Sequence, residues 1–83
     1  MNKVLIKLYV PLIEQQYDVL IPINKKVFQV IKLLVKSVND LTGGYYRVNE
    51  LPMLYDKITA EMYDINSTIK ENDIKNGSEI IML

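Results

Sequence analysis

The segment from Asn24 to Gly44, NKKVFQVIKLLVKSVNDLTGG, decides the fold of this 83-residue chain. Its apolar residues recur every three or four positions, the spacing that gathers side chains on one face of an α-helix. This stripe consists of Val27, Val30, Ile31, Leu34, Val38 and Leu41. The pattern predicts a helix over about residues 25–41, with Asn24 as its N-cap and Gly43-Gly44 ending it. Because one amphipathic helix cannot bury such a stripe alone, the flanking segments must form the surface on which it packs.

The residues before this segment carry the alternating pattern of half-buried strands. Apolar side chains occupy every second position over residues 4–10 and again over residues 17–21, so both stretches are predicted strands. The segment from Pro11 to Gln16 is expected to be the hairpin loop between them, because proline lacks the N–H that a central strand needs. The face turned toward the helix is predicted to carry Val4, Ile6, Leu8, Val10, Tyr17, Val19 and Ile21.

The residues after the helix carry shorter strand signals. Residues 53–58 are predicted to form a strand, and residues 61–63 a short strand that pairs antiparallel with it across a tight turn. Residues 64–75 read as a tight loop with one short helical turn. Three isoleucines in this loop are expected to plug the core: Ile65, Ile69 and Ile74.

A final strand is predicted over residues 79–83, after a turn at Asn76-Gly77, with Ile80 and Met82 pointing inward. Placed beside the first strand, it would run parallel to it. The result is an α+β fold, a mixed sheet of four to five strands crossed by one helix, which is the β-grasp arrangement. Eighty-three residues suffice for one small domain, so residues 1–83 are predicted to be a single domain.

The composition argues against an enzyme. The chain contains no cysteine and no histidine, so it lacks thiolate chemistry and the commonest general base and metal ligand. Its serines therefore have no histidine base, and no phosphate-binding glycine motif is present. Four acidic residues lack the ligand spacing of a calcium loop and are expected to cap turns or face solvent: Asp56, Asp64, Glu71 and Asp73. We therefore expect no catalytic residue, no cofactor and no metal site.

Charge and hydropathy narrow the class of partner. The ten basic and ten acidic residues cancel and the basic ones are scattered, so nucleic acid is not expected as a partner. The apolar N-terminal stretch is interrupted by Lys7 and Pro11 and is followed by no cleavage site, so neither a signal peptide nor a membrane span is predicted. Together with the absence of cysteine, this pattern favours a mature protein of the cytoplasm.

The sheet face opposite the helix is the predicted binding surface. Its outward apolar side chains are expected to merge into one patch, which a monomer seldom leaves to water, so a protein partner or self-association is predicted. The alternative is that these side chains only support cross-strand pairs. The predicted partner-binding residues are Leu5, Lys7, Tyr9, Leu20, Ile81 and Leu83, with Asp18 among them and Leu12 and Ile13 extending the surface at the hairpin tip.

A second group of candidates follows the helix. Tyr45, Tyr46 and Arg47 could form a recognition cluster, but aromatic residues folded over a core edge are the commoner outcome.

Several stretches of the chain resemble a known family. They are Tyr17-Asp18-Val19-Leu20-Ile21, Asp73-Ile74-Lys75-Asn76-Gly77, and the Ile-rich ending Glu79-Ile80-Ile81-Met82-Leu83. With the loop from Thr68 to Ile74, they resemble the ubiquitin superfold over the whole chain. The resemblance is closer to the YukD and EsaB family, small bacterial ubiquitin-like proteins associated with type VII secretion. None of these stretches is a catalytic signature, and no individual functional residue is carried over.

The resemblance implies a non-conjugated interaction module, an accessory or regulatory component of a type VII secretion system whose partner is a protein of that system. Ubiquitin and the sulfur carriers of the same fold are activated at a flexible C-terminal diglycine. This sequence stops at Leu83 within a predicted strand, and its one diglycine, Gly43-Gly44, is expected to end the helix. A sulfur carrier or protein modifier is therefore a disfavoured alternative, and a self-assembling structural module is a third.

Overall fold

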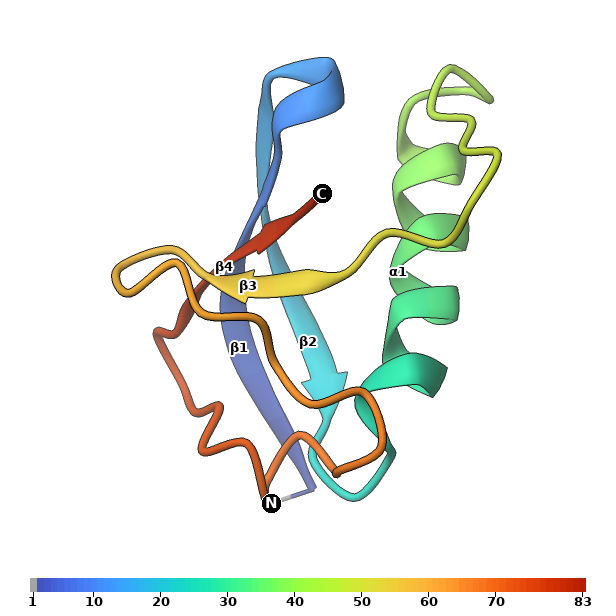
Figure 1. Ribbon diagram of the computed structural model, residues 1–83. Helices are drawn as coiled ribbons and strands as arrows, with labels where there is room; N and C mark the ends of the chain where they lie inside the picture. Colours follow the sequence, from blue (N-terminus) through green and yellow to red (C-terminus); the bar gives the residue numbers. More distant parts are fainter. Residues whose placement is uncertain (1) are drawn as a thin grey trace.

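A mixed sheet packs with one face against a single α-helix (Figure 1). The computed structural model describes residues 2–83. Its elements are β1 (Lys3–Val10), a short 3-10 helix η1 (Pro11–Ile13), β2 (Gln15–Pro22), α1 (Val27–Leu41), β3 (Leu54–Asp56) and β4 (Glu79–Met82). The predicted helix and four of the five predicted strands are therefore present, with boundaries shifted by up to two residues.

The strands lie in the order β2-β1-β4-β3. β1 pairs antiparallel with β2 and parallel with β4, and β3 pairs antiparallel with β4. This topology confirms the predicted mixed sheet crossed by one helix, with four strands. The predicted short strand over residues 61–63 is wrong as a strand, since the only ladder contact that the described residues make there is an isolated bridge between Tyr55 and Met62. Two backbone hydrogen bonds, from Asp56 N to Glu61 O (2.8 Å) and from Tyr63 N to Leu54 O (2.9 Å), flank that bridge.

The helix begins at Val27, with Lys26 as its N-cap, so the prediction of Asn24 as N-cap is wrong. The segment before the helix is held by the loop around Ile69 instead. Ile69 N donates to Lys25 O (3.1 Å), and Lys70 N donates to Ile23 O (3.0 Å). This pairing fixes the segment in place, so the helix cannot start earlier.

The first N–H groups of α1 also find their acceptors in this loop. Val27 N donates to Ser67 O at 2.9 Å, and Phe28 N donates to Ile65 O at 3.2 Å. These groups have no partner within a helix and normally need a cap. Here the loop carbonyls replace a capping side chain, so tertiary contacts overrode the local sequence signal.

The other end of the helix behaves as predicted except for Leu41. Gly43 and Gly44 adopt positive φ angles of 65° and 90°, and Gly44 N donates to Asn39 O at 2.8 Å, which closes the last turn. Leu41 was expected to complete the buried stripe but is 64% exposed. A groove separates the last turn of α1 from the β1–β2 hairpin tip, so no sheet residue covers Leu41.

The core lies between α1 and the sheet and contains most of the predicted residues. The other five residues of the helix stripe are buried, as are Ile80 and Met82 of β4. Ile69 and Ile74 plug the core as predicted, whereas Ile65 is half-buried at its edge. The predicted inward residues of the first two strands divide into two groups, with Ile6, Leu8, Val10 and Ile21 buried and Val4, Tyr17 and Val19 half-buried against the core.

The tyrosines after the helix separate in the structure. Tyr46 is 3% exposed and joins the core, and its N–H donates to Thr42 Oγ1 at 3.0 Å. Tyr45 is 87% exposed. The two side chains therefore do not form a recognition cluster, and the commoner outcome, an aromatic ring over the core edge, holds for Tyr46.

A pair of adjacent leucines on α1 tests the packing of the core. Leu34 is 2% exposed and Leu33 is 48% exposed. We expect Leu34→Ala to lower the free energy of unfolding by about 2–5 kcal/mol, because it leaves a cavity under the helix. Leu33→Ala should cost less than about 1 kcal/mol. Urea denaturation of both variants measures the difference, and equal losses would contradict this packing.

The fold is expected to lose stability at alkaline pH because of Tyr63. Burial raises the pKa of Tyr63 to about 12 from 10.0, and the negative charge and hydrogen bond of Asp56 add to this shift. The neutral phenol is therefore favoured in the folded state, which gives stability that is complete below pH 10 and is lost as the pH rises toward about 12. Tyr63→Phe should lose less stability across this pH range than the unmodified chain does. Thermal unfolding at several pH values measures this loss, and Tyr45→Phe, at an exposed site, should behave like the unmodified chain.

Candidate protein-interaction surface

The sheet face that α1 leaves open carries three rows of side chains, because outward residues of neighbouring strands lie side by side. The first row is apolar. Leu5 of β1 stands opposite Leu20 of β2, and the two side chains are 45% and 58% exposed. On the β4 side, the row continues at Gly77, whose N–H donates to Leu5 O at 2.8 Å. These leucines form the first part of the predicted binding surface.

The second row crosses the sheet with charges of alternating sign. Lys7 lies between Asp18 on β2 and Glu79 on β4 in the strand register. Lys57 follows Glu79, because Lys57 N donates to Glu79 O at 3.0 Å. From β2 to the end of β3, the row reads Asp18, Lys7, Glu79 and Lys57, and we call it the charged row.

The third row is aromatic and aliphatic. Tyr9 of β1 lies beside Ile81 of β4, which lies beside Tyr55 of β3. All three side chains are half-buried. The charged row separates this third row from the Leu5–Leu20 pair, so the predicted single apolar patch is divided into two parts.

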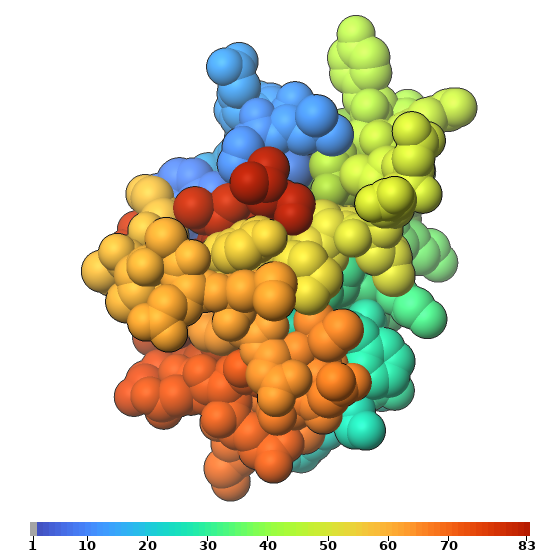
Figure 2. All heavy atoms as spheres, viewed as in Figure 1, coloured from blue at the N-terminus to red at the C-terminus, as the bar shows by residue number. Residues whose placement is uncertain are grey.

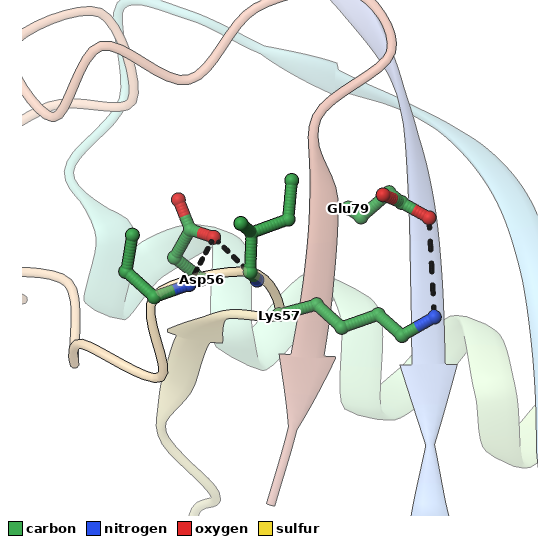
Figure 3. Close-up of polar contacts among 5 residues, drawn as sticks. Asp56, Lys57 and Glu79 are labelled. Atoms are coloured by element: carbon green, nitrogen blue, oxygen red, sulfur yellow. Dashed lines mark hydrogen bonds and ion pairs between the residues drawn. The ribbon is translucent and has the colours of Figure 1, made fainter.

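Lys57 joins the charged row to the third row. Figure 3 shows its side chain extending across β4, with its ammonium group beside Glu79. The Nζ atom lies 3.9 Å from Glu79 Oε1 and 3.8 Å from the centroid of the Tyr9 ring. The contact with Tyr9, followed by the charge of Glu79, raises the pKa of Lys57. The cation therefore covers part of Tyr9 and keeps its charge on this face.

A turn at the end of β3 orients Lys57. Asp56 Oδ1 accepts hydrogen bonds from Ile58 N at 2.8 Å and Thr59 N at 3.2 Å (Figure 3). A carboxylate that binds backbone N–H groups two and three residues later fixes a tight turn. The sequence predicted that Asp56 caps a turn or faces solvent. In the structure it caps this turn, which places Lys57 at the end of the charged row.

Leu83 lies apart from the other predicted residues. It follows β4 and exchanges two backbone hydrogen bonds with Met53, both 3.0 Å long. Its side chain is 66% exposed and lines a shallow hollow that also contacts Leu12 and Leu51. The structure therefore brings Leu5 and Leu20 together, and Tyr9 and Ile81 together, but it places Leu83 at the end of the sheet. The assignment of all six residues to partner binding stays a prediction.

The structure contains a groove at the hairpin tip that the sequence did not predict. It has a volume of about 750 Å³ and lies between the tip and the C-terminal end of α1. Figure 2 shows the hollow between the blue hairpin tip and the yellow-green residues that follow the helix. Its exposed apolar walls include Leu12, Leu41 and Tyr45. The sequence predicted that Leu12 is exposed, but it also predicted that Leu41, on the opposite wall, is buried. The groove between them was therefore not predicted.

Among residues 2–83, no group of three or more acidic side chains is arranged to hold a metal ion. Ser67 Oγ donates to Asp64 Oδ2 at 3.0 Å, and the N–H of Asn66, followed by this bond, lowers the pKa of Asp64. These contacts belong to a turn. In the same part of the chain, no helix has the length and apolar character needed to cross a membrane.

Solved structures similar to this chain are ubiquitin-like domains. The ubiquitin-like domain of EccD5 from Mycobacterium xenopi matches with a TM-score of 0.80 and 15% identity, covering 100% of this chain and 94% of that one. The ubiquitin-like domain of the Mycobacterium tuberculosis type VII secretion system protein ECCD1 matches with a TM-score of 0.78 and 10% identity, covering 100% and 99%. These matches confirm the predicted ubiquitin-like β-grasp fold.

A third similar structure is a chain of the MycP5-free ESX-5 inner membrane complex. It matches with a TM-score of 0.69 and 12% identity, and the match covers 100% of this chain but 21% of that one. No protein-family model and no curated protein sequence matches the chain. Membership of the YukD and EsaB family therefore stays a prediction.

Two adjacent residues of β2 test whether the first row is free for binding. Leu20 is 58% exposed and Ile21 is 2% exposed. We expect Leu20→Ser to change the free energy of unfolding by about 0.5 kcal/mol or less. Ile21→Ser should cost more than about 2 kcal/mol, because it removes a core side chain. If thermal unfolding shows equal losses, Leu20 supports the sheet, and the cross-strand alternative is correct.

Proposed function

We propose that this chain is a non-conjugated ubiquitin-like protein-interaction module, an accessory or regulatory component of a type VII secretion system. The observation that carries the proposal is the likeness to two EccD ubiquitin-like domains over the whole chain, with more than nine-tenths of each neighbour covered. The resemblance of its sequence to the YukD and EsaB family supports the same assignment. A protein of that family would act in the bacterial cytoplasm.

The proposed binding surface is the open face of the sheet. Interfaces between proteins commonly combine an apolar centre with polar groups that fix the register. This face offers the exposed Leu5–Leu20 pair and the Tyr9–Ile81 pair on either side of the charged row. Leu83 extends the surface at the end of β4.

We propose that the module acts by binding and not by catalysis or group transfer. The diglycine of this chain closes α1 with two positive φ angles and a hydrogen bond from Gly44 N to Asn39 O, so it has a structural role. The serine with the best-placed acidic neighbour, Ser67, donates to Asp64 in a turn, and the sequence offers no histidine to activate it. Both features favour an interaction module over a modifier or an enzyme.

The proposed partner is a protein of the secretion machinery. One structural neighbour belongs to an inner membrane complex. We propose that this chain, which needs no membrane insertion of its own for this role, contacts the cytoplasmic part of such a complex. Because the partner would bind the open sheet face, α1 would keep its packing against the opposite face.

Charged substitutions on the open face test the proposal. A variant that combines Leu5→Glu, Tyr9→Glu and Ile81→Glu should remain folded by circular dichroism but bind co-expressed type VII secretion components at least about 30-fold more weakly, the loss typical of interface hot spots. Leu33→Glu adds a similar charge to the exposed side of α1 and should leave binding unchanged. Affinity capture with purified components, followed by calorimetry, measures both.

Two results would count against the proposal. Undiminished capture by the triple variant would exclude the sheet face. Failure of the unmodified chain to bind any component of the secretion system would exclude the proposed role in secretion.

A further inference from the structure

We infer that the open sheet face binds the same face of a second copy of this chain, forming a symmetric dimer whose register is set by the charged row. The inference rests on the proposed function, because it names a partner for the same surface. It depends on the order of charges across four neighbouring strands. From β2 to the end of β3 these charges are negative, positive, negative and positive: Asp18, Lys7, Glu79 and Lys57.

This order of charges is complementary to itself when it is reversed. In a two-fold symmetric interface, residue i contacts residue j of the partner and the reverse contact also forms. If the symmetry axis lies in the interface and runs along the strands, Lys7 faces Glu79 of the second copy. Asp18 then faces the strand position of Lys57 of the second copy. To reach this contact, the Lys57 side chain swings away from Tyr9 and Glu79, which now lie 3.8 Å and 3.9 Å from its Nζ atom, and it uncovers the Tyr9 ring. All four contacts across such a dimer join opposite charges.

A symmetry axis that runs across the strands through the charged row is excluded by the same charges. Such an axis would place each member of the row opposite itself. Asp18 would then face Asp18 of the second copy, and Lys7 would face Lys7 of the second copy. Like charges in contact at an interface cost several kcal/mol, so the row selects the axis along the strands. Sheets that pack face to face also favour nearly aligned strands.

The apolar rows complement each other in the same arrangement. With the axis between β1 and β4, Tyr9 of one copy faces Ile81 of the other on one side of the charged row. On the other side, Leu5 faces Gly77, which lies beside Leu5 in its own sheet. Gly77 has no side chain, and the space where a Cβ would stand is open, so the leucine can approach the backbone there.

The charges of the row are accessible for contacts between copies. Lys7 and Asp18 are exposed, and neither has a carboxylate or ammonium partner within 4.0 Å among residues 2–83. The Lys57–Glu79 pair is loose, at 3.9 Å, and both side chains are about one-third exposed. Ion pairs at an interface give specificity more than affinity, so the apolar rows supply the attraction and the charged row fixes the register.

Self-association would then compete with the secretion partner. Both events use the open face, so a dimer hides the residues that the partner contacts. The concentration of the chain, together with that of the partner, would decide how many copies are available for binding. Dimer formation would thereby cover the open face of the copies that have no secretion partner.

Charge reversal in two separate variants tests the dimer. Lys7→Glu alone places a carboxylate opposite Glu79 of a second copy, and Glu79→Lys alone places two ammonium groups in contact. Each variant should raise the dimer dissociation constant at least about 100-fold relative to the unmodified chain. A one-to-one mixture of the two variants restores an opposite-charge contact and should form a heterodimer. Sedimentation equilibrium measures each sample.

Matched controls separate dimer formation from folding. Lys32→Glu makes the same charge change on α1, far from the sheet face in the fold, and should leave the dissociation constant unchanged. Asp18→Lys mixed with Lys57→Glu tests the outer contacts in the same way, should one variant of the first pair fail to fold. NMR signals of a ¹⁵N-labelled Lys7→Glu chain should shift at Tyr9 and Ile81 only when the unlabelled Glu79→Lys chain is added.

The possible outcomes are distinct. Monomeric behaviour of the unmodified chain at its highest attainable concentration, or a mixture that stays monomeric, overturns the dimer. If the triple variant at Leu5, Tyr9 and Ile81 still loses its secretion partner in that case, the proposed function stands without the dimer. If a dimer forms but no secretion component binds the chain, the dimer stands and the proposed function fails.

Discussion

The backbone pairing between the start of α1 and the loop around Ile69 is the constraint on which the rest of the structure depends. Residues 23–28 and 65–70 are joined by four hydrogen bonds of 2.9–3.2 Å, two of which cap the first turn of the helix. The same loop buries Ile69 completely. By fixing where the helix begins and how it crosses the sheet, this pairing decides which sheet face is covered and which is open.

The open face is consequently where we propose that this fold contacts other molecules. Parallel pairing of β1 with β4 brings Lys7 beside Glu79 and Tyr9 beside Ile81, although more than seventy residues separate them along the chain. Neither a charged row nor its apolar neighbours would exist without that central pair of strands. A surface of this kind suits a binding module, and its alternating charges also suit a copy of itself.

Much of the fold was predictable because the helical and the strand periodicity of the sequence are regular. The stripe from Val27 to Val38 and the alternation in residues 4–10 are local patterns that burial enforces. The prediction failed where local signals met tertiary contacts. Asn24 is a good capping residue, but its segment pairs with another loop, and Leu41 continues the stripe beyond the point where the sheet can cover it. The alternation of the strands predicted that Leu5, Tyr9 and Ile81 share the open face, but not that Glu79 and Lys57 complete a charged row that divides it.

The sequence by itself determined the helix, four of the five predicted strands, most of the side chains that point inward, and the absence of histidine and cysteine, because these follow from composition and from contacts between near neighbours. Only the tertiary structure decided the order of the strands and their register. Both depend on hydrogen bonds between distant segments, which a one-residue shift would rearrange. That register sets the order of charges across the open face, on which the proposed pairing with a second copy rests.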